Sequence, residues 1–185
     1  MTKSLTIDSF SVASSEEVVQ LIPMIHRELV GLSHLYPEFR NWFSQKVVPG
    51  IFTGERSLLV ELREDSIAGV AIIKDDGVEK KLCCLRVSTE FQKKGGVGYR
   101  LFERSMEELD TRYPLLSVSE DRFSEFRRIF NHFGYEKAWE YPELYRLGKV
   151  ELSFNGLLLP IDRDESRPYQ NAKIRSAPIY RASVV

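Results

Sequence analysis

The chain has 185 residues, of which 43% are hydrophobic and 29% charged, and its formal net charge is −1. This length suits one domain with a full core, and the near-zero charge gives no global field that would attract nucleic acid or an anionic membrane. The two cysteines, Cys83 and Cys84, are adjacent in an apolar run, which is typical of small buried side chains and not of a disulfide framework or metal site. Because no signal-peptide pattern and no window of about 18 apolar residues occurs, we expect a cytoplasmic protein without a membrane span.

The first fifty residues predict one strand and two helices. Apolar and polar residues alternate over residues 4–12, which favours a strand. A Ser-x-x-Glu capping box at Ser14 precedes apolar residues that recur at helical spacing as far as Leu29. A shorter helix is expected over residues 37–48, and the Pro-Gly pair that follows is expected to end it.

The middle of the chain predicts an antiparallel meander. Apolar runs over residues 57–63, 67–74 and 80–88 are separated by two short polar turns. Runs of this length, joined so closely, are typical of consecutive strands that pair with their neighbours.

The remaining ordered elements alternate between helices and strands. We expect helices over 97–113 and 123–133 and strands over 114–120, 135–141 and 149–154. The order of elements indicates an α+β fold, a mixed αβα sandwich in which about four helices flank a mostly antiparallel sheet of about six or seven strands. We expect one domain over residues 1–158 and a flexible or loosely docked tail over residues 159–185, where proline and mixed charge replace periodicity.

Three glycines, Gly95, Gly96 and Gly98, lie between a predicted strand and a predicted helix. Such a turn presents unpaired N–H groups at the positive end of the helix dipole and can bind an anion. Neither common phosphate motif fits, because the Gly-Lys-Ser/Thr ending of a P-loop is absent and G-x-G-x-x-G fails after Gly98.

The segment LRVSTEFQKKGGVGYRLFERSMEEL resembles the signature segment of the GNAT superfamily of acetyl-CoA-dependent N-acetyltransferases. In that family a strand is followed by Arg/Gln-x-x-Gly-x-Gly/Ala, which opens a helix. FRRIFNHFGYEKAW, residues 126–139, is similar to the family's later helix with its Gly-aromatic ending. The element order also agrees, so the likeness covers about residues 4–155. It implies the GNAT fold and transfer of an acetyl group from acetyl-CoA to a primary amine.

The resemblance implies two contacts with coenzyme A. The pyrophosphate would rest on N–H groups of the glycine loop, where a Cβ atom would hold the phosphate oxygens away, and the pantetheine arm would pair with the preceding strand. Two lysines would add local positive charge. The expected cofactor-binding residues are Leu85, Arg86, Val87, Gln92, Lys93, Lys94, Gly95, Gly96, Val97, Gly98 and Tyr99.

The sequence departs from the family pattern in two places. The glycine loop is one residue longer than usual; we prefer the register Lys93-x-x-Gly96-x-Gly98, since the alternative that starts at Gln92 lacks the final small residue. In the later helix, many members carry a Tyr that protonates the leaving thiolate, and Phe130 occupies that position. The leaving thiolate would then be protonated by water or by Tyr135, or it would leave without an acid.

Three further residues are candidates for the acceptor side. Glu79 lies about where some family members hold a general base; the alternative, which its position favours, is a turn carboxylate without that role. Tyr36 and Trp42 lie in an aromatic stretch that would border the acceptor pocket in this fold, or they belong to the helix core. No metal is expected.

The acceptor is open between a small-molecule amine, a peptide N-terminus and a lysine side chain. An alternative is a domain that binds acyl-CoA with little or no turnover and acts as a regulatory or interaction module; nucleic acid and membrane partners are not expected. Since family members often dimerise, a homodimer is compatible with the resemblance.

Overall fold

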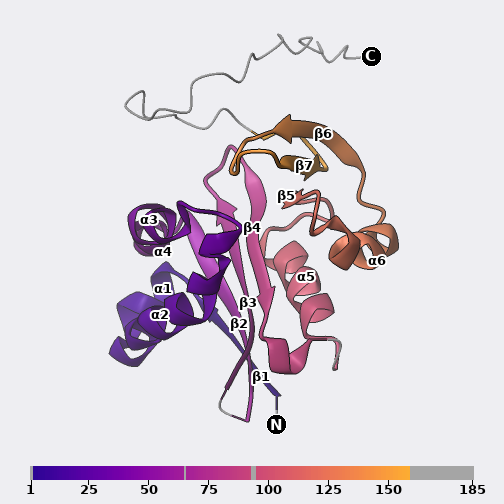
Figure 1. Cartoon of the computed structure of the whole chain (residues 1–185). Coiled ribbons are helices and arrows are strands. Elements are labelled where there is room, and N and C mark those ends of the chain that lie inside the picture. The colour runs from indigo at the N-terminus through magenta and orange to yellow at the C-terminus, as the bar shows by residue number, and fades with distance from the viewer. Residues whose placement is uncertain (1, 65, 93–94, 159–185) are drawn as a thin grey trace, which may run out of the picture.

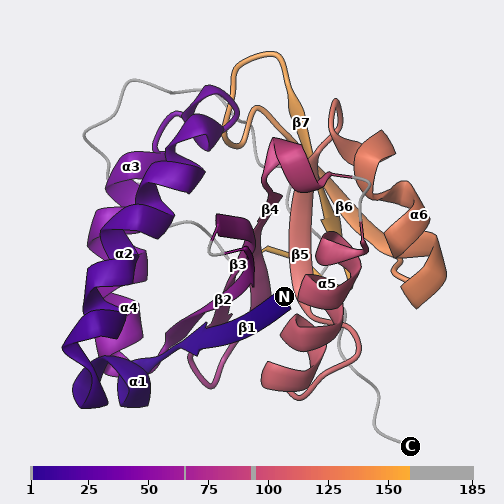
Figure 2. The same ribbon diagram turned by 90° about the horizontal axis from the view of Figure 1, so that it is seen from below.

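The computed structural model describes residues 2–64, 66–92 and 95–158. A seven-stranded sheet lies between two layers of helices, with α1–α4 on one face and α5 and α6 on the other (Figures 1 and 2). The predicted αβα sandwich is therefore confirmed. Lys93, Lys94 and the predicted tail over 159–185 lie outside the described residues.

The strands are β1 (Thr2–Ile7), β2 (Arg56–Arg63), β3 (Ser66–Asp75), β4 (Lys80–Val87), β5 (Leu115–Ser119), β6 (Lys137–Pro142) and β7 (Val150–Phe154). The α-helices are α1 (Ser9–Ser14), α2 (Glu16–Leu29), α3 (Phe39–Trp42), α4 (Val48–Thr53), α5 (Val97–Glu108) and α6 (Phe123–Phe133). Short helical turns of other types are η1 (Val30–His34), η2 (Phe43–Val47) and η3 (Thr89–Phe91). None of these helices combines the length and apolar character that a membrane span needs.

The sheet order is β1-β2-β3-β4-β5-β7-β6. Strands β2, β3 and β4 form the antiparallel meander that the sequence predicts, and β4 and β5 are parallel neighbours joined through α5. Strand β7 lies between β5 and β6 and pairs antiparallel with both. The single parallel pair therefore divides the sheet into a four-stranded and a three-stranded part.

Each face of the sheet has its own hydrophobic core. Beneath α5 and α6, the fully buried Leu101 and Phe102 pack with Phe130. Beneath α1–α4, Ile25 and Leu29 pack against the other face. Apolar residues of α2 and α5 recur at 3–4 spacing and so cover one face each, which is why both helices lie flat on the sheet.

The predicted first strand is too long, because a helix begins within it. Strand β1 ends at Ile7, and the Asp8 carboxylate then accepts a hydrogen bond from the Ser11 N–H at 2.8 Å, which caps α1. Ser14 is the last residue of α1 and not the cap of the next helix. Ser15 takes that role, since its hydroxyl accepts the Val18 N–H at 3.4 Å.

The predicted stop at Pro49-Gly50 is also wrong. The helical path continues from α3 through the π-turn η2 into α4 and ends at Gly54, whose φ is 84°. Pro49 lies in the first turn of α4, where a missing N–H costs little. Helix α5, predicted to reach Tyr113, ends earlier because Asp110 adopts a left-handed conformation with φ 45°.

Candidate functional site

Strands β4 and β5 separate soon after they meet. Their pairing consists of Lys81 with Leu115 and Leu82 with Leu116. A bulge in the β3–β4 pairing follows at Cys83, and bulges bend the strand that carries them. Beyond it, β4 pairs only with β3 among the described strands, and the end of β5 pairs only with β7.

The consequence is an unpaired main-chain edge on β4 at the residues that the resemblance assigns to the pantetheine arm. Leu85, Arg86 and Val87 pair with β3 on one side and with no described strand on the other. Such an edge presents N–H and C=O groups to any extended ligand with amide groups. The side chains of Leu85 and Val87 pack on the α5–α6 core. Arg86 extends to the opposite face, where a Cβ atom on Gly31 would lie 3.4 Å from its Nη1.

The glycine loop leads from this edge into α5. Gly95 and Gly96 have φ values of 61° and 67°, which glycine adopts without strain, and Gly96 caps the helix without a side-chain hydrogen bond. Among the described residues, no hydrogen-bond acceptor reaches the N–H groups of Val97, Gly98 and Tyr99. These donors lie at the positive end of α5, and with no acceptor in the described part of the chain they offer a place where an anion can bind.

Gly98 and Gln92 hold the loop close to the end of β4. A Cβ atom on Gly98 would lie 3.4 Å from Val87 Cγ2, so the helix start leaves little room for bulk there. The Gln92 side-chain amide donates to the Val87 carbonyl at 3.2 Å. Within the described part of the chain, no cluster of His, Cys, Asp or Glu is placed to hold a metal ion.

Two arginines that the sequence did not indicate bind the main chain of the glycine loop. Arg63 Nη2 donates to the Gly95 carbonyl at 2.9 Å, and Arg100 Nη1 donates to the same oxygen at 2.5 Å. A Cβ atom on Gly95 would lie 2.2 Å from Arg63 Nη2. The absence of a side chain at Gly95 therefore permits two things: the left-handed turn and the close approach of the Arg63 guanidinium to the backbone.

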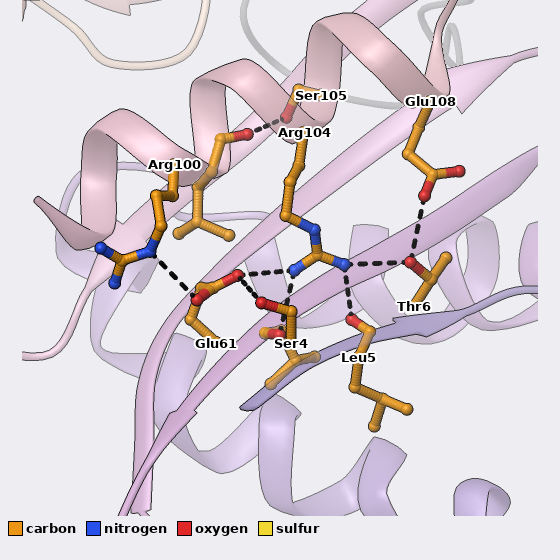
Figure 3. Close-up of polar contacts among 10 residues, drawn as sticks. Ser4, Leu5, Thr6, Glu61, Arg100, Arg104, Ser105 and Glu108 are labelled. Atoms are coloured by element: carbon orange, nitrogen blue, oxygen red, sulfur yellow. Dashed lines mark hydrogen bonds and ion pairs between the residues drawn. The ribbon is translucent and has the colours of Figure 1, made fainter. Parts of the chain in front are cut away.

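Arg100 is in turn tied to a buried carboxylate on β2 (Figure 3). Glu61 is fully buried; its Oε2 accepts Arg100 Nε at 3.4 Å, and its Oε1 accepts Arg104 Nη1 at 2.8 Å and the Ser4 hydroxyl at 2.7 Å. Figure 3 shows both arginines reaching from α5 toward the β1–β2 pair. Contacts therefore run from Glu61 through Arg100 to the carbonyl of the glycine loop.

A second buried glutamate, Glu151, lies on the opposite face of the sheet. It pairs with Ser119 at the end of β5, and strand alternation turns it away from the core that contains Leu152. The residue is 4% exposed, and the Tyr36 hydroxyl lies 3.5 Å from its Oε1. Tyr145 stacks edge-on against Tyr36, with ring centroids 5.4 Å apart.

The environment of Glu151 favours its protonated form. Burial raises the pKa of Glu151 to about 7, and the Ser117 and Tyr36 hydroxyls and the charges of Lys81 and Arg146 limit the shift. Among the described residues, no cation forms an ion pair with it. The Arg146 guanidinium instead binds the Ser119 hydroxyl at 2.8 Å and Asp121 at 2.9 Å.

The structure brings only one of the three predicted acceptor-side residues to Glu151. Tyr36 contacts its carboxyl. Trp42 packs against Phe39 and lies 5.7 Å beneath the Arg56 guanidinium. Glu79 is ion-paired to Lys74 Nζ at 3.0 Å.

Phe130 is enclosed by aromatic side chains, so no proton donor stands at its position. It is 2% exposed and packs against Phe126, Phe154 and Tyr135. Tyr135 belongs to the same core; burial raises its pKa to about 12, and its hydroxyl has no partner among the described residues.

No protein-family model and no curated protein sequence matches this chain. Solved structures do match. One from Desulfovibrio desulfuricans, assigned to the GNAT family of acetyltransferases, has 15% identity and a TM-score of 0.62 over 83% of this chain and 97% of its own. The ribosomal-protein-S18-alanine N-acetyltransferase of Escherichia coli has 16% identity and a TM-score of 0.61 over 83% and 92%. An aminoglycoside 6'-N-acetyltransferase complexed with coenzyme A has 15% identity and a TM-score of 0.54 over 83% and 94%. The splayed parallel strands, the glycine turn into α5 and these matches together show that the chain has the GNAT acetyltransferase fold.

Proposed function

We propose that the protein is an N-acetyltransferase that moves an acetyl group from acetyl-CoA to a primary amine by direct attack. The observation that carries the proposal is that the N–H groups of Val97, Gly98 and Tyr99, which have no acceptor among the described residues, lie beside the edge of β4 that pairs with no described strand. The N–H groups can bind a diphosphate, and the β4 edge can pair with an extended ligand segment that contains amide groups.

The residues present fit coenzyme A. The loop N–H groups would bind the diphosphate, and Gly95 and Gly96 adopt the left-handed turn without a side chain of their own. Main-chain groups at residues 85–87 would pair with the pantetheine amides, although the Val87 carbonyl already accepts one hydrogen bond, from the Gln92 side-chain amide. When bound, the cofactor supplies an activated acetyl thioester. The protein then contributes positioning of the amine and polarisation of the carbonyl by a backbone N–H.

The acceptor would approach from the face that carries Tyr36 and Trp42. A small-molecule amine, a peptide N-terminus or a lysine would suit the proposal equally. Two proteins of similar structure are named for different acceptors, a ribosomal-protein alanine and an aminoglycoside, so the fold does not choose between them. Glu79 is one candidate for the group that accepts the amine's proton.

One observation favours a second function. Phe130 fills the position of the usual acid with a buried ring that carries no proton donor, and the hydroxyl of its neighbour Tyr135 is buried in the same core. A domain that binds acyl-CoA without efficient turnover, acting as a regulatory or interaction module, would need no such donor.

Calorimetry with coenzyme A and a thiol-release assay with acetyl-CoA and a panel of amines test both functions. We expect the wild type to bind coenzyme A and to release thiol with at least one amine; binding without release from any amine would favour the module.

In Gly98→Val, branched methyls would crowd the space beside Val87, so coenzyme A binding should be lost while the fold remains. Gly156→Val is the matched control, since a Cβ atom there makes an ordinary 3.6 Å contact with Leu115. Unchanged affinity in Gly98→Val would remove the loop from the cofactor site.

A further inference from the structure

Two glutamates with almost wholly buried side chains stand in contrasting environments. Glu61 is 0% exposed and is neutralised by Arg100 and Arg104. Glu151 is 4% exposed and has no ion-pair partner among the described residues. A buried carboxyl that lacks a cation is costly, and such groups are concentrated at functional sites. The structural role that explains Glu61 does not explain Glu151.

The position of Glu151 relates it to the proposed reaction. It lies opposite Ser119 at the end of β5, where β4 has already diverged. Its carboxyl is on the face of the sheet that α1–α4 cover, which also carries the two half-buried tyrosines Tyr36 and Tyr145. The Tyr36 hydroxyl is 3.5 Å from Glu151 Oε1, a long contact that can tighten when a ligand binds.

We propose that Glu151 is the proton acceptor of the acetyl-transfer reaction and that the Tyr36 hydroxyl connects it to the acceptor amine. This inference rests on the proposed function. As the amine nitrogen bonds to the acetyl carbon, its proton moves to Tyr36 Oη and the phenolic proton moves to Glu151 Oε1. The C–S bond breaks, and its electron pair leaves with the sulfur. Glu151, now protonated, returns the proton to solvent before the next turnover.

The polar and charged groups that face Glu151 are consistent with this role. Tyr36 precedes α3, Ser117 lies on β5, Lys81 on β4, and Tyr145 and Arg146 on the β6–β7 connection. With its pKa raised to about 7 by burial, Glu151 can accept a proton near neutral pH and release it again. Burial, and then the charge of Glu151, raise the pKa of Tyr36, so its phenol stays protonated. Tyr36 can therefore give a proton to Glu151 only as it accepts one from the amine.

Steady-state kinetics across pH test the assignment. In Glu151→Gln, kcat at pH above about 8 should fall roughly 100-fold or more, while KM for acetyl-CoA is unchanged and the acidic limb near pH 7 disappears. Tyr36→Phe should lower kcat but keep the acidic limb, because the titrating carboxyl remains. Glu140→Gln, on the exposed face of β6, is the control and should match the wild type. Loss of the limb in Glu79→Gln with its retention in Glu151→Gln would assign the role to Glu79 and overturn the proposal.

A second measurement does not depend on turnover. In ¹³C-glutamate spectra, the carboxyl resonance missing from Glu151→Gln should titrate in the wild type within about one unit of pH 7. A midpoint near the ordinary glutamate value would overturn the proposal. If the wild type transfers acetyl groups and Glu151→Gln has the same rate and pH profile as the wild type, this assignment alone is overturned. A wild type that acetylates no amine overturns the proposed function and this assignment with it.

Discussion

The Arg104 guanidinium lies 2.8 Å from the buried Glu61 carboxylate, so an ion pair ties helix α5 to strand β2 (Figure 3). The same guanidinium donates to the Leu5 carbonyl at 3.1 Å. One side chain of α5 therefore reaches two strands, and Glu61 compensates the charge that this contact brings into the interior. The arrangement sets where α5, and hence the glycine turn at its start, sits on the sheet.

Glu61→Gln should be strongly destabilising. Removing the carboxylate leaves Arg104, and to a lesser degree Arg100, without its counter-charge, and breaking one side of a buried pair typically costs about 3–5 kcal/mol. Urea denaturation at neutral pH measures the change. Glu107→Gln, exposed on the same helix, should change the free energy of unfolding by no more than about 0.5 kcal/mol. Equal effects of the two substitutions would contradict the role assigned to the Glu61 network.

Glu151→Gln should act in the opposite direction at alkaline pH. The pKa of Glu151 is raised from 4.5 to about 7, so between these values the folded state binds more protons than the unfolded state. The contribution of Glu151 to stability is therefore full below about pH 4.5 and is lost as pH rises to about 7, a change of about 3 kcal/mol. The variant should lack this loss and be more stable than the wild type at about pH 8. Thermal unfolding across pH measures it, and parallel stability–pH curves for the two proteins would show that the carboxyl is not perturbed.

Gly69→Ala should disturb the packing of α5 against strand β3. A Cβ atom on Gly69 would lie 2.8 Å from Val97 Cγ1 and 2.9 Å from Leu101 Cδ1, both in the first turns of the helix, and 3.1 Å from the Arg86 carbonyl. Overpacking of this kind costs about 1–3 kcal/mol. Because the clash lifts the helix start away from the end of β4, coenzyme A affinity should fall along with stability. Denaturation together with calorimetry checks both, and a stable protein with unchanged affinity would refute the close approach.

The sequence was sufficient for features that rest on local patterns. The meander from β2 to β4 follows from apolar runs and short polar turns, and the end of α6 follows from Gly134, which adopts φ 70°. Boundaries failed where a weaker local signal competed with a stronger one. Asp8 offered a helix cap inside an alternating pattern, and Pro49 was compatible with the first turn of a helix as well as with its end.

The sequence could not indicate the contacts of Glu151 and Arg63, because both depend on distant segments. Strand β7 alternates apolar residues with Glu151 and Ser153, a pattern typical of a strand with one solvated face. That face is covered here by Tyr36, which is 115 residues earlier in the chain. Arg63 likewise meets Gly95 across a separation of 32 residues. The glycine pattern predicted where an anion could bind but not what holds the loop in place.

Restoring a tyrosine at position 130 should not restore an acid. The Phe130 ring lies 4.6 Å from Phe154 and 5.8 Å from Phe126 between ring centroids, and Tyr135 closes the same core. A hydroxyl added to this ring would be buried among aromatic side chains, and burying one without a hydrogen bond costs about 1–3 kcal/mol. Phe130→Tyr should therefore lower the free energy of unfolding by that amount and leave kcat for acetyl transfer no higher than in the wild type. Denaturation and thiol-release rates on the same preparation measure both quantities. A rise in kcat with a new basic limb in the pH profile would show instead that the ring edge reaches the reacting sulfur and that this position can still supply a proton.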